Sequence, residues 1–154
     1  MTDIIEIHLQ KLGIALPEAT QPIANYVTTL QSSGNQLFVS GQLPLLNGKP
    51  IAAGKVGVTV SVEQAKKAAE VCALNILAQI KTALGDLKRI KRVIKITVFV
   101  AVDPHFTDIP LIANGASDLF VNILGESGKH VRSAIGVASL PMNVPVEVEA
   151  IIEI

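Results

Sequence analysis

One arginine near the C-terminus has neighbours that suit a carboxylate-binding site. In the segment Val131–Val137, alternation along a strand places Arg132 on the same face as two small residues, Ala134 and Gly136. Small side chains leave room for a ligand beside the guanidinium group, and the planar fork of an arginine can bind a carboxylate through two parallel hydrogen bonds. These residues predict a small-molecule site centred on Arg132.

Two acidic residues in the last predicted strand could act together with this arginine. In the strand expected over residues 145–152, Glu147 and Glu149 alternate with apolar residues and therefore share one face. If the loop over residues 139–143 closes a hairpin, Arg132 lies opposite or diagonal to one of these glutamates. A glutamate there could hold the arginine or orient a water molecule for reaction. The residue types alone favour the simpler alternative, an ordinary cross-strand ion pair.

Three helices are predicted from apolar residues that recur at steps of three and four. The long central helix begins at a capping box of Ser61 and Gln64, and its apolar stripe includes Cys72, which we interpret as a buried small hydrophobe. The expected helices span residues 4–12, 62–84 and 109–124, with N-caps at Asp3 or Thr2, at Ser61 and at Asp108, and with ends at Gly13, Gly85 and Gly125.

Five strands are predicted from β-branched residues and two-residue alternation. They span residues 26–30, 36–40, 93–102, 131–137 and 145–152, and a turn at residues 32–35 joins the first two. The order helix, strand, strand, long helix, strand, helix, strand, strand is typical of an α+β domain with its helices on one face of the sheet. The opposite face is then free to contact neighbouring subunits.

The composition describes a chain with an unusually apolar balance. Its 154 residues suit a single domain, yet 49% of them are apolar and only 17% are charged. Part of that apolar surface should be covered by partners, and copies of the same chain are the expected cover. The longest uninterrupted apolar run, residues 98–102, is far shorter than the ~20 residues that span a bilayer, so membrane insertion is not expected.

The charge and the cysteine and histidine content narrow the range of possible functions further. The formal net charge is zero and aromatic residues make up 3% of the chain, whereas nucleic-acid binders usually present a basic field with stacking aromatics. The early acidic residues at the N-terminus do not suit a signal peptide, and a single cysteine fits a reducing cytoplasm. His8, His105 and His130 fall in three different segments, so no metal site is predicted from them.

Three segments resemble the signatures of one known family. Residues 132–150, which read Arg-Ser-Ala-Ile-Gly-Val-Ala-Ser-Leu-Pro-Met-Asn-Val-Pro-Val-Glu-Val-Glu-Ala, resemble the C-terminal signature of the Rid family, also called the YjgF/YER057c/UK114 family. Residues 38–44, Phe-Val-Ser-Gly-Gln-Leu-Pro, resemble its second signature, and residues 94–100 resemble the strand before its second helix. The resemblance covers residues 26–154 and leaves residues 1–25 as an N-terminal extension with a short helix, as in a longer-chain branch.

Similarity to the Rid family implies a chorismate-mutase-like α+β fold, with two helices packed on one face of a mixed sheet. It also implies a homotrimer with a cleft at each subunit interface. Characterised members hydrolyse reactive enamines and imines, such as 2-aminoacrylate and 2-iminobutanoate, to 2-oxo acids and ammonia, and they use no metal and no cofactor. Together with the composition, the resemblance predicts one Rid-like domain over residues 1–154 that binds a small carboxylate-bearing substrate and itself, with no nucleic-acid or membrane partner.

The signatures also assign roles to individual residues by their positions. Arg132 takes the position of the arginine that binds the substrate carboxylate, and Glu147 takes that of the glutamate near the hydrolytic water. Ala134 stands where many members have cysteine, a change that keeps backbone contacts but could alter the pocket's shape. Further pocket positions are matched by Tyr26, Ser40, Gly41 and Asn114. Judged by local chemistry alone, the tyrosine could be a packing residue, the serine and glycine a strand end, and the asparagine a solvated helix residue.

Two other functions stay open. The same arginine could serve a non-catalytic trimer that binds carboxylate metabolites or acts as a regulator, and the sequence does not separate this function from deamination because both need Arg132. The endoribonuclease or translation-inhibitor activity historically attached to the family is the weakest candidate. Neutral charge, few aromatic residues and the lack of a paired-histidine arrangement all argue against it.

Overall fold

Five strands form the mixed sheet at the centre of the computed structural model, which describes residues 3–154. They span Thr29–Gln31 (β1), Gln36–Gln42 (β2), Arg92–Ala101 (β5), Val131–Val137 (β6) and Val146–Glu153 (β7). Their order across the sheet is β1-β2-β7-β5-β6, with β5 and β6 parallel and every other neighbouring pair antiparallel. The sheet therefore has β6 as one of its two edges.

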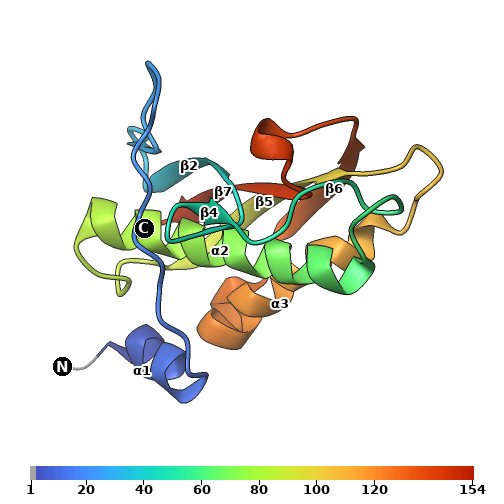
Figure 1. Cartoon of the computed structure of the whole chain (residues 1–154). Helices are drawn as coiled ribbons and strands as arrows, with labels where there is room; N and C mark the ends of the chain where they lie inside the picture. Colours follow the sequence, from blue (N-terminus) through green and yellow to red (C-terminus); the bar gives the residue numbers. More distant parts are fainter. Residues whose placement is uncertain (1–2) are drawn as a thin grey trace.

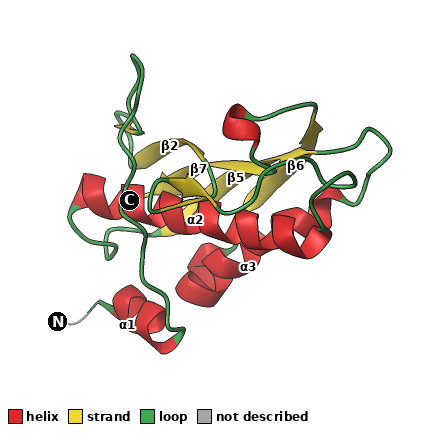
Figure 2. Cartoon of the chain, in the orientation of Figure 1, coloured by secondary structure: helices red, strands yellow, loops and turns green. Residues whose placement is uncertain are grey.

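Two long helices cover one face of this sheet, as Figures 1 and 2 show. They are α2, Val62–Leu84, and α3, Ile109–Leu124, and they pack against each other as well as against the strands. The opposite face of the sheet carries no α-helix in the described chain. The expected α+β architecture, with both long helices on one face, is confirmed.

The ends of these helices follow from local sequence signals. In the capping box, Ser61 Oγ accepts the backbone N–H of Gln64 at 3.1 Å, and Gln64 Oε1 accepts that of Ser61 at 2.9 Å. Gly85 ends α2 with a φ of 87°, which favours a residue without a Cβ. Asp108 occupies the N-cap position of α3 as predicted, but its side chain makes no capping hydrogen bond.

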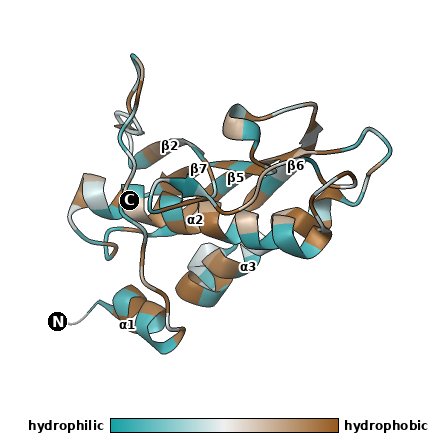
Figure 3. Ribbon diagram, viewed as in Figure 1, coloured by the Kyte–Doolittle hydropathy of each residue, from teal (hydrophilic) through white to brown (hydrophobic). Residues whose placement is uncertain are grey.

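The core lies between α2, α3 and the inner strands, where apolar residues concentrate in Figure 3. Small residues such as Ala65 and Ala69 let α2 approach the sheet closely, and both are fully buried. Cys72 is buried among them with its Sγ 3.6 Å from the carbonyl oxygen of Val146. Burial raises the pKa of the Cys72 thiol, and the carboxylate of Glu147 raises it further. The interpretation of Cys72 as a buried hydrophobe is confirmed.

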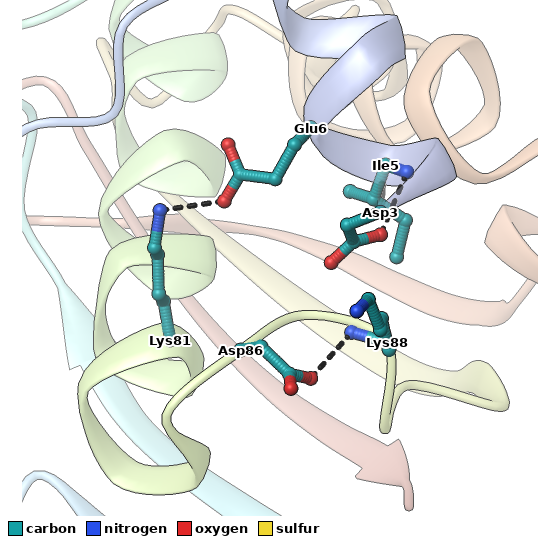
Figure 4. A network of polar contacts seen from close by, with 6 residues as sticks. All are labelled: Asp3, Ile5, Glu6, Lys81, Asp86 and Lys88. Atoms are coloured by element: carbon teal, nitrogen blue, oxygen red, sulfur yellow. Dashed lines mark hydrogen bonds and ion pairs between the residues drawn. The ribbon is translucent and has the colours of Figure 1, made fainter. Parts of the chain in front are cut away.

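The N-terminal helix α1, Ile4–Lys11, packs against α3 and contributes Ile5 to the same core. Its N-cap is Asp3, whose Oδ1 accepts the backbone N–H of Ile5 at 2.9 Å, while the alternative cap Thr2 lies outside the described residues. Glu6 forms an ion pair with Lys81 of α2, which Figure 4 shows. α1 is thus tied to both long helices.

The first strand is shorter than predicted, and Tyr26 lies outside it. The backbone N–H of Tyr26 donates locally to the carbonyl of Ala24 at 2.9 Å, in a bend that precedes β1. Ser40 Oγ then donates to the carbonyls of Val27 and Thr28 at 3.2 and 3.0 Å. The Thr28 carbonyl also accepts the backbone N–H of Ser40 at 2.9 Å, but Tyr26 bonds within the bend, and the strand predicted over 26–30 begins only at Thr29.

A small hairpin was not predicted. Leu45–Leu46 (β3) pairs with Lys49–Pro50 (β4) around Asn47 and Gly48, whose φ values of 52° and 74° suit the tight turn that an Asn-Gly pair forms. Two short 3-10 helices, Gly125–Gly128 and Pro141–Asn143, complete the described elements. Across residues 3–154, no helix combines the length and the apolar character that a membrane span needs.

Candidate functional site

The hairpin that would place Arg132 opposite or diagonal to a glutamate does not form, because β5 lies between the last two strands. Ile96 of β5 pairs with Arg132 of β6, and Phe99 of β5 pairs with Glu147 of β7. The connecting loop carries the chain past the end of β5, where Ala101 N–H donates to Pro145 O at 2.9 Å. Arg132 and Glu147 therefore belong to strands that are not neighbours in the sheet.

The two residues also point to opposite faces of the sheet. Directly paired residues share a face, and Ile96, the partner of Arg132, is fully buried against the helices. Glu147 lies between the buried residues Val146 and Val148, so it faces the side that carries no helix. In the described chain Arg132 makes no ion pair with a carboxylate, so the cross-strand pair is absent from the molecule.

The guanidinium group of Arg132 is anchored to α3. Its Nη1 donates to Asn114 Oδ1 at 2.9 Å and to Ser117 Oγ at 3.1 Å, two groups about one helical turn apart. No acceptor within residues 3–154 contacts Nε or Nη2. The side chain borders a shallow hollow of about 370 Å³ that Ser117, Lys129 and His130 also line. Arg132 is held firmly at one edge and leaves its other N–H groups available.

Ser117 and His130 belong to this cluster although the sequence did not single them out for it. Ser117 Oγ lies 2.9 Å from His130 Nε2, and His130 Nδ1 lies 2.6 Å from the carbonyl oxygen of Gly128. Their spacing carried a signal: His130 precedes Arg132 by two residues, and Ser117 follows Asn114 by three. That signal becomes meaningful only once β6 is known to pack against α3.

The small residues beside Arg132 play a different part from the one predicted. A Cβ on Gly136 would lie 2.8 Å from Ile109 Cδ1 and 2.9 Å from Val102 Cγ2, so side chains already fill the space above this glycine. Ala134 is half-buried and packs against the same core. Gly136 thus lets the start of α3 approach the strand, and it does not make room for a ligand.

The remaining predicted residues gather on the other face of the sheet. β2 has a bulge there, because Val39 pairs with Ala150 while Gln42 pairs with Val148. Within the bulge, a side chain on Gly41 would overlap Glu147 Oε1, so the absence of a Cβ lets the carboxylate lie against the backbone. Tyr26 and Ser40 line a hollow of about 520 Å³ whose lining does not include Gly41 or Glu147; it also includes Thr28, Phe38, Lys95, Thr97 and Glu149.

In this second group, the surroundings of Glu147 raise the pKa of its carboxyl group. Glu147 is half-buried, and burial raises the pKa of its carboxyl group above the ordinary value of 4.5. The charge of Glu149, two residues along the strand, raises that pKa further. A carboxylate with a raised pKa accepts a proton more readily from water than an exposed glutamate does.

The predicted site residues therefore form two separate groups in one chain. The first group lies at the β6 edge on the helix side and consists of Arg132, Asn114 and Ala134. The second group lies on the face that carries no α-helix, here called the open face, and consists of Tyr26, Ser40, Gly41 and Glu147. Among the residues that the structure describes, no three histidine, cysteine, aspartate or glutamate side chains lie close enough together to hold a metal ion.

Comparison with known proteins shows which family the chain belongs to. A family model described as "YjgF/chorismate mutase-like, putative endoribonuclease" matches residues 6–154. Protein TCP17 of Trypanosoma cruzi is 46% identical over 151 residues, which are 97% of this chain and 94% of that protein. A 2-iminobutanoate/2-iminopropanoate deaminase of Dermatophagoides farinae is 28% identical over 141 residues, which are 92% of this chain and 94% of that protein.

The fold agrees with this assignment. The crystal structure of Atu1372 from Agrobacterium tumefaciens, a protein of unknown function, is 54% identical to the chain and matches it with a TM-score of 0.92. The match covers 99% of this chain and 93% of that one. With the family model spanning nearly the whole sequence, the chain belongs to the YjgF/chorismate-mutase-like family, the Rid family that its C-terminal residues resemble.

Proposed function

We propose that this protein hydrolyses reactive 2-enamine and 2-imine acids, of the 2-aminoacrylate and 2-iminobutanoate class, to 2-oxo acids and ammonia. The observation that carries the proposal is the state of Arg132, whose Nη1 is bound to α3 while Nε and Nη2 contact no acceptor within residues 3–154. Such an arginine is prepared to bind a carboxylate through two hydrogen bonds. The deaminase of Dermatophagoides farinae, a relative in the same family, supports the choice of reaction.

The active site in this proposal is completed between the subunits of a homotrimer. One chain holds Arg132 and Glu147 on opposite faces of its sheet, so a second copy has to bring the two groups together. The open face suits an interface because the apolar side chains of Leu30, Phe38 and Ile135 are exposed there. A cyclic assembly of identical chains would repeat the same composite site at each interface.

The reaction needs only orientation of the substrate and a positioned water molecule. An enamine substrate first becomes the imine, as its nitrogen loses a proton and its β-carbon gains one. Arg132 binds the carboxylate, and Glu147 takes a proton from water while the water oxygen forms a bond to the imine carbon. The C=N bond becomes a single bond, and its nitrogen takes that proton from Glu147 to give a neutral carbinolamine and then a proton from solvent to give a protonated amine. The carbinolamine hydroxyl loses its proton, the C–N bond breaks, and ammonia leaves the 2-oxo acid. These steps use no metal and no cofactor.

The test is the release of ammonia and 2-oxobutanoate from 2-iminobutanoate, measured against the buffer rate. We expect wild-type protein to exceed that rate and Arg132→Ala to fall to it. Arg89→Ala, which removes an exposed arginine with no contact to the site, serves as the matched control and should retain wild-type activity. If wild type and Arg132→Ala both match the buffer rate, deamination is excluded.

A second candidate function is carboxylate binding without turnover. One chain already holds Arg132 in place, whereas Glu147 lies on the other face, so binding requires less of the assembly than catalysis does. In that case 2-oxobutanoate should raise the melting temperature of wild type but not of Arg132→Ala, with no acceleration of imine hydrolysis. RNA cleavage that survives purification and is lost in Arg132→Ala would favour a ribonuclease instead.

A further inference from the structure

We propose that Ser117 and His130 are positioning residues that determine which edge of Arg132 binds the carboxylate. The inference rests on the proposed role of Arg132 in substrate binding and adds two residues outside the family signature. A chain of hydrogen bonds runs from the Gly128 carbonyl through His130 and Ser117 to the guanidinium group. Each link has a fixed direction, so the chain holds Arg132 in one orientation.

The direction of these hydrogen bonds is set by the Gly128 carbonyl group, which can only accept a hydrogen bond. The carbonyl oxygen of Gly128 lies 2.6 Å from His130 Nδ1, so Nδ1 carries the hydrogen. In a neutral imidazole the other nitrogen, Nε2, is then an acceptor, and the group 2.9 Å from it is the hydroxyl of Ser117. Ser117 therefore donates to His130 and presents its oxygen lone pairs to Arg132 Nη1 at 3.1 Å.

The number of N–H donors on Nη1 determines which edge of the Arg132 guanidinium group stays available to a ligand. Nη1 has two N–H groups, and Asn114 Oδ1 and Ser117 Oγ accept both of them. The Nε–Nη2 edge is left for a ligand, and its two parallel N–H groups match the two oxygens of one carboxylate. Asn114 alone would satisfy one hydrogen of Nη1 and allow the group to turn, whereas Ser117 supplies the second fixed point.

The acceptor at the start of the chain is itself rigid. Gly128 is buried, and a Cβ there would overlap the carbonyl oxygen of Phe120, so the turn packs directly on α3. The ring of Phe120 meets the imidazole of His130 edge to face, with centroids 6.1 Å apart and an angle of 77°. The neighbouring cation Lys129 pairs with Glu126 at 2.7 Å. His130 is therefore fixed by packing as well as by hydrogen bonds.

The kinetic test separates orientation from general stability. We expect Ser117→Ala to raise KM for 2-iminobutanoate about tenfold, as the loss of one hydrogen bond to a charged group implies, with little change in kcat. Ser117→Thr keeps the hydroxyl group and should restore KM, and His130→Leu should raise KM as Ser117→Ala does. Asn122→Ala, on the exposed side of α3, is the matched control and should behave as wild type. Equal KM values for wild type, Ser117→Ala and His130→Leu would overturn the proposal.

A second measurement needs no catalysis and so distinguishes this inference from the proposed function. NMR of the nitrogen-labelled imidazoles in wild-type protein at neutral pH, with the His130 signal identified by its loss in His130→Leu, reports the tautomer. We expect a proton on Nδ1 and none on Nε2. A proton on Nε2 instead would contradict the proposed chain of hydrogen bonds even if deamination is observed. The expected tautomer would support that chain of hydrogen bonds even if no turnover is found.

Discussion

At the scale of single residues, the chain places Arg132 and Glu147, the two groups of the proposed site, on opposite faces of the sheet. Arg132 and Glu147 could be selected as candidates from the sequence, the first by its residue type and both by their positions in the C-terminal signature. Ser117 and His130 could not be found in that way. Their role depends on α3 packing against β6, which brings together residues 13 positions apart in the chain.

Glu147 should cost the folded protein stability at neutral pH. Its pKa is raised on folding, so between the ordinary value of 4.5 and the raised value the folded chain binds more protons than the unfolded chain. The free energy of unfolding therefore falls as pH rises through this window and stays lowered above it. We expect Glu147→Gln to melt at a higher temperature than wild type at neutral pH, with the gain lost well below pH 4.5.

The control for this prediction is Glu18→Gln, which changes an exposed glutamate and should leave the melting temperature nearly unchanged at every pH. A Glu147→Gln variant that is less stable than wild type at neutral pH would show that the charged carboxylate is stabilised by a partner. Melting curves of the three proteins across the acidic range measure the difference.

At the scale of elements, predictions from local signals succeeded, among them the hairpin of β1 and β2, whereas the expected pairing of β6 with β7 was wrong. The capping box at Ser61 and the glycine at position 85 placed the ends of α2 correctly, because both signals act within one turn. The hairpin expected between β6 and β7 failed because alternation gives the face of a residue but not the neighbour of a strand. β5, which separates them, comes much earlier in the chain.

The bulge in β2 should control the position of the Glu147 carboxylate. In Gly41→Ala the new methyl group would overlap Glu147 Oε1, the far end of a flexible side chain, so the fold should persist while the carboxylate moves. We expect kcat to fall about a hundredfold, the low end of what a positioned general base contributes. Combining Gly41→Ala with Glu147→Gln should add little further loss. Fully additive losses would mean that Gly41 acts independently of Glu147.

The close crossing of α2 and α3 should depend on Gly115. A Cβ there would overlap the backbone carbonyl of Lys66, and neither helix backbone can move aside easily. We expect Gly115→Ala to lower the free energy of unfolding by about 1–3 kcal/mol, measured by urea denaturation. Gly34→Ala is the matched control, because the nearest atom to its new Cβ is 3.9 Å away. Equal stability of the two variants would contradict the expected clash.

At the scale of the whole molecule, one chain carries the two halves of the proposed site on opposite faces of its sheet, and exposed apolar side chains share the face of Glu147. The apolar composition already predicted that copies of the chain would cover part of its surface, but only the topology indicates which residues a second copy must bring. In the proposed trimer, Arg132 of one subunit and Glu147 of the next act on the same substrate from different ends, without pairing with each other. Light scattering should then give three times the 16.3 kDa mass of the chain.

Subunit complementation tests this central claim most directly. Arg132→Ala and Glu147→Gln should each be inactive toward 2-iminobutanoate when purified alone. In mixed trimers formed by co-expression in equal amounts, about a quarter of the interfaces would join an intact Arg132 to an intact Glu147, so about a quarter of wild-type activity should return. If both groups acted within one chain, no mixed assembly would contain a complete site, and a mixture as inactive as its parents would contradict the shared site.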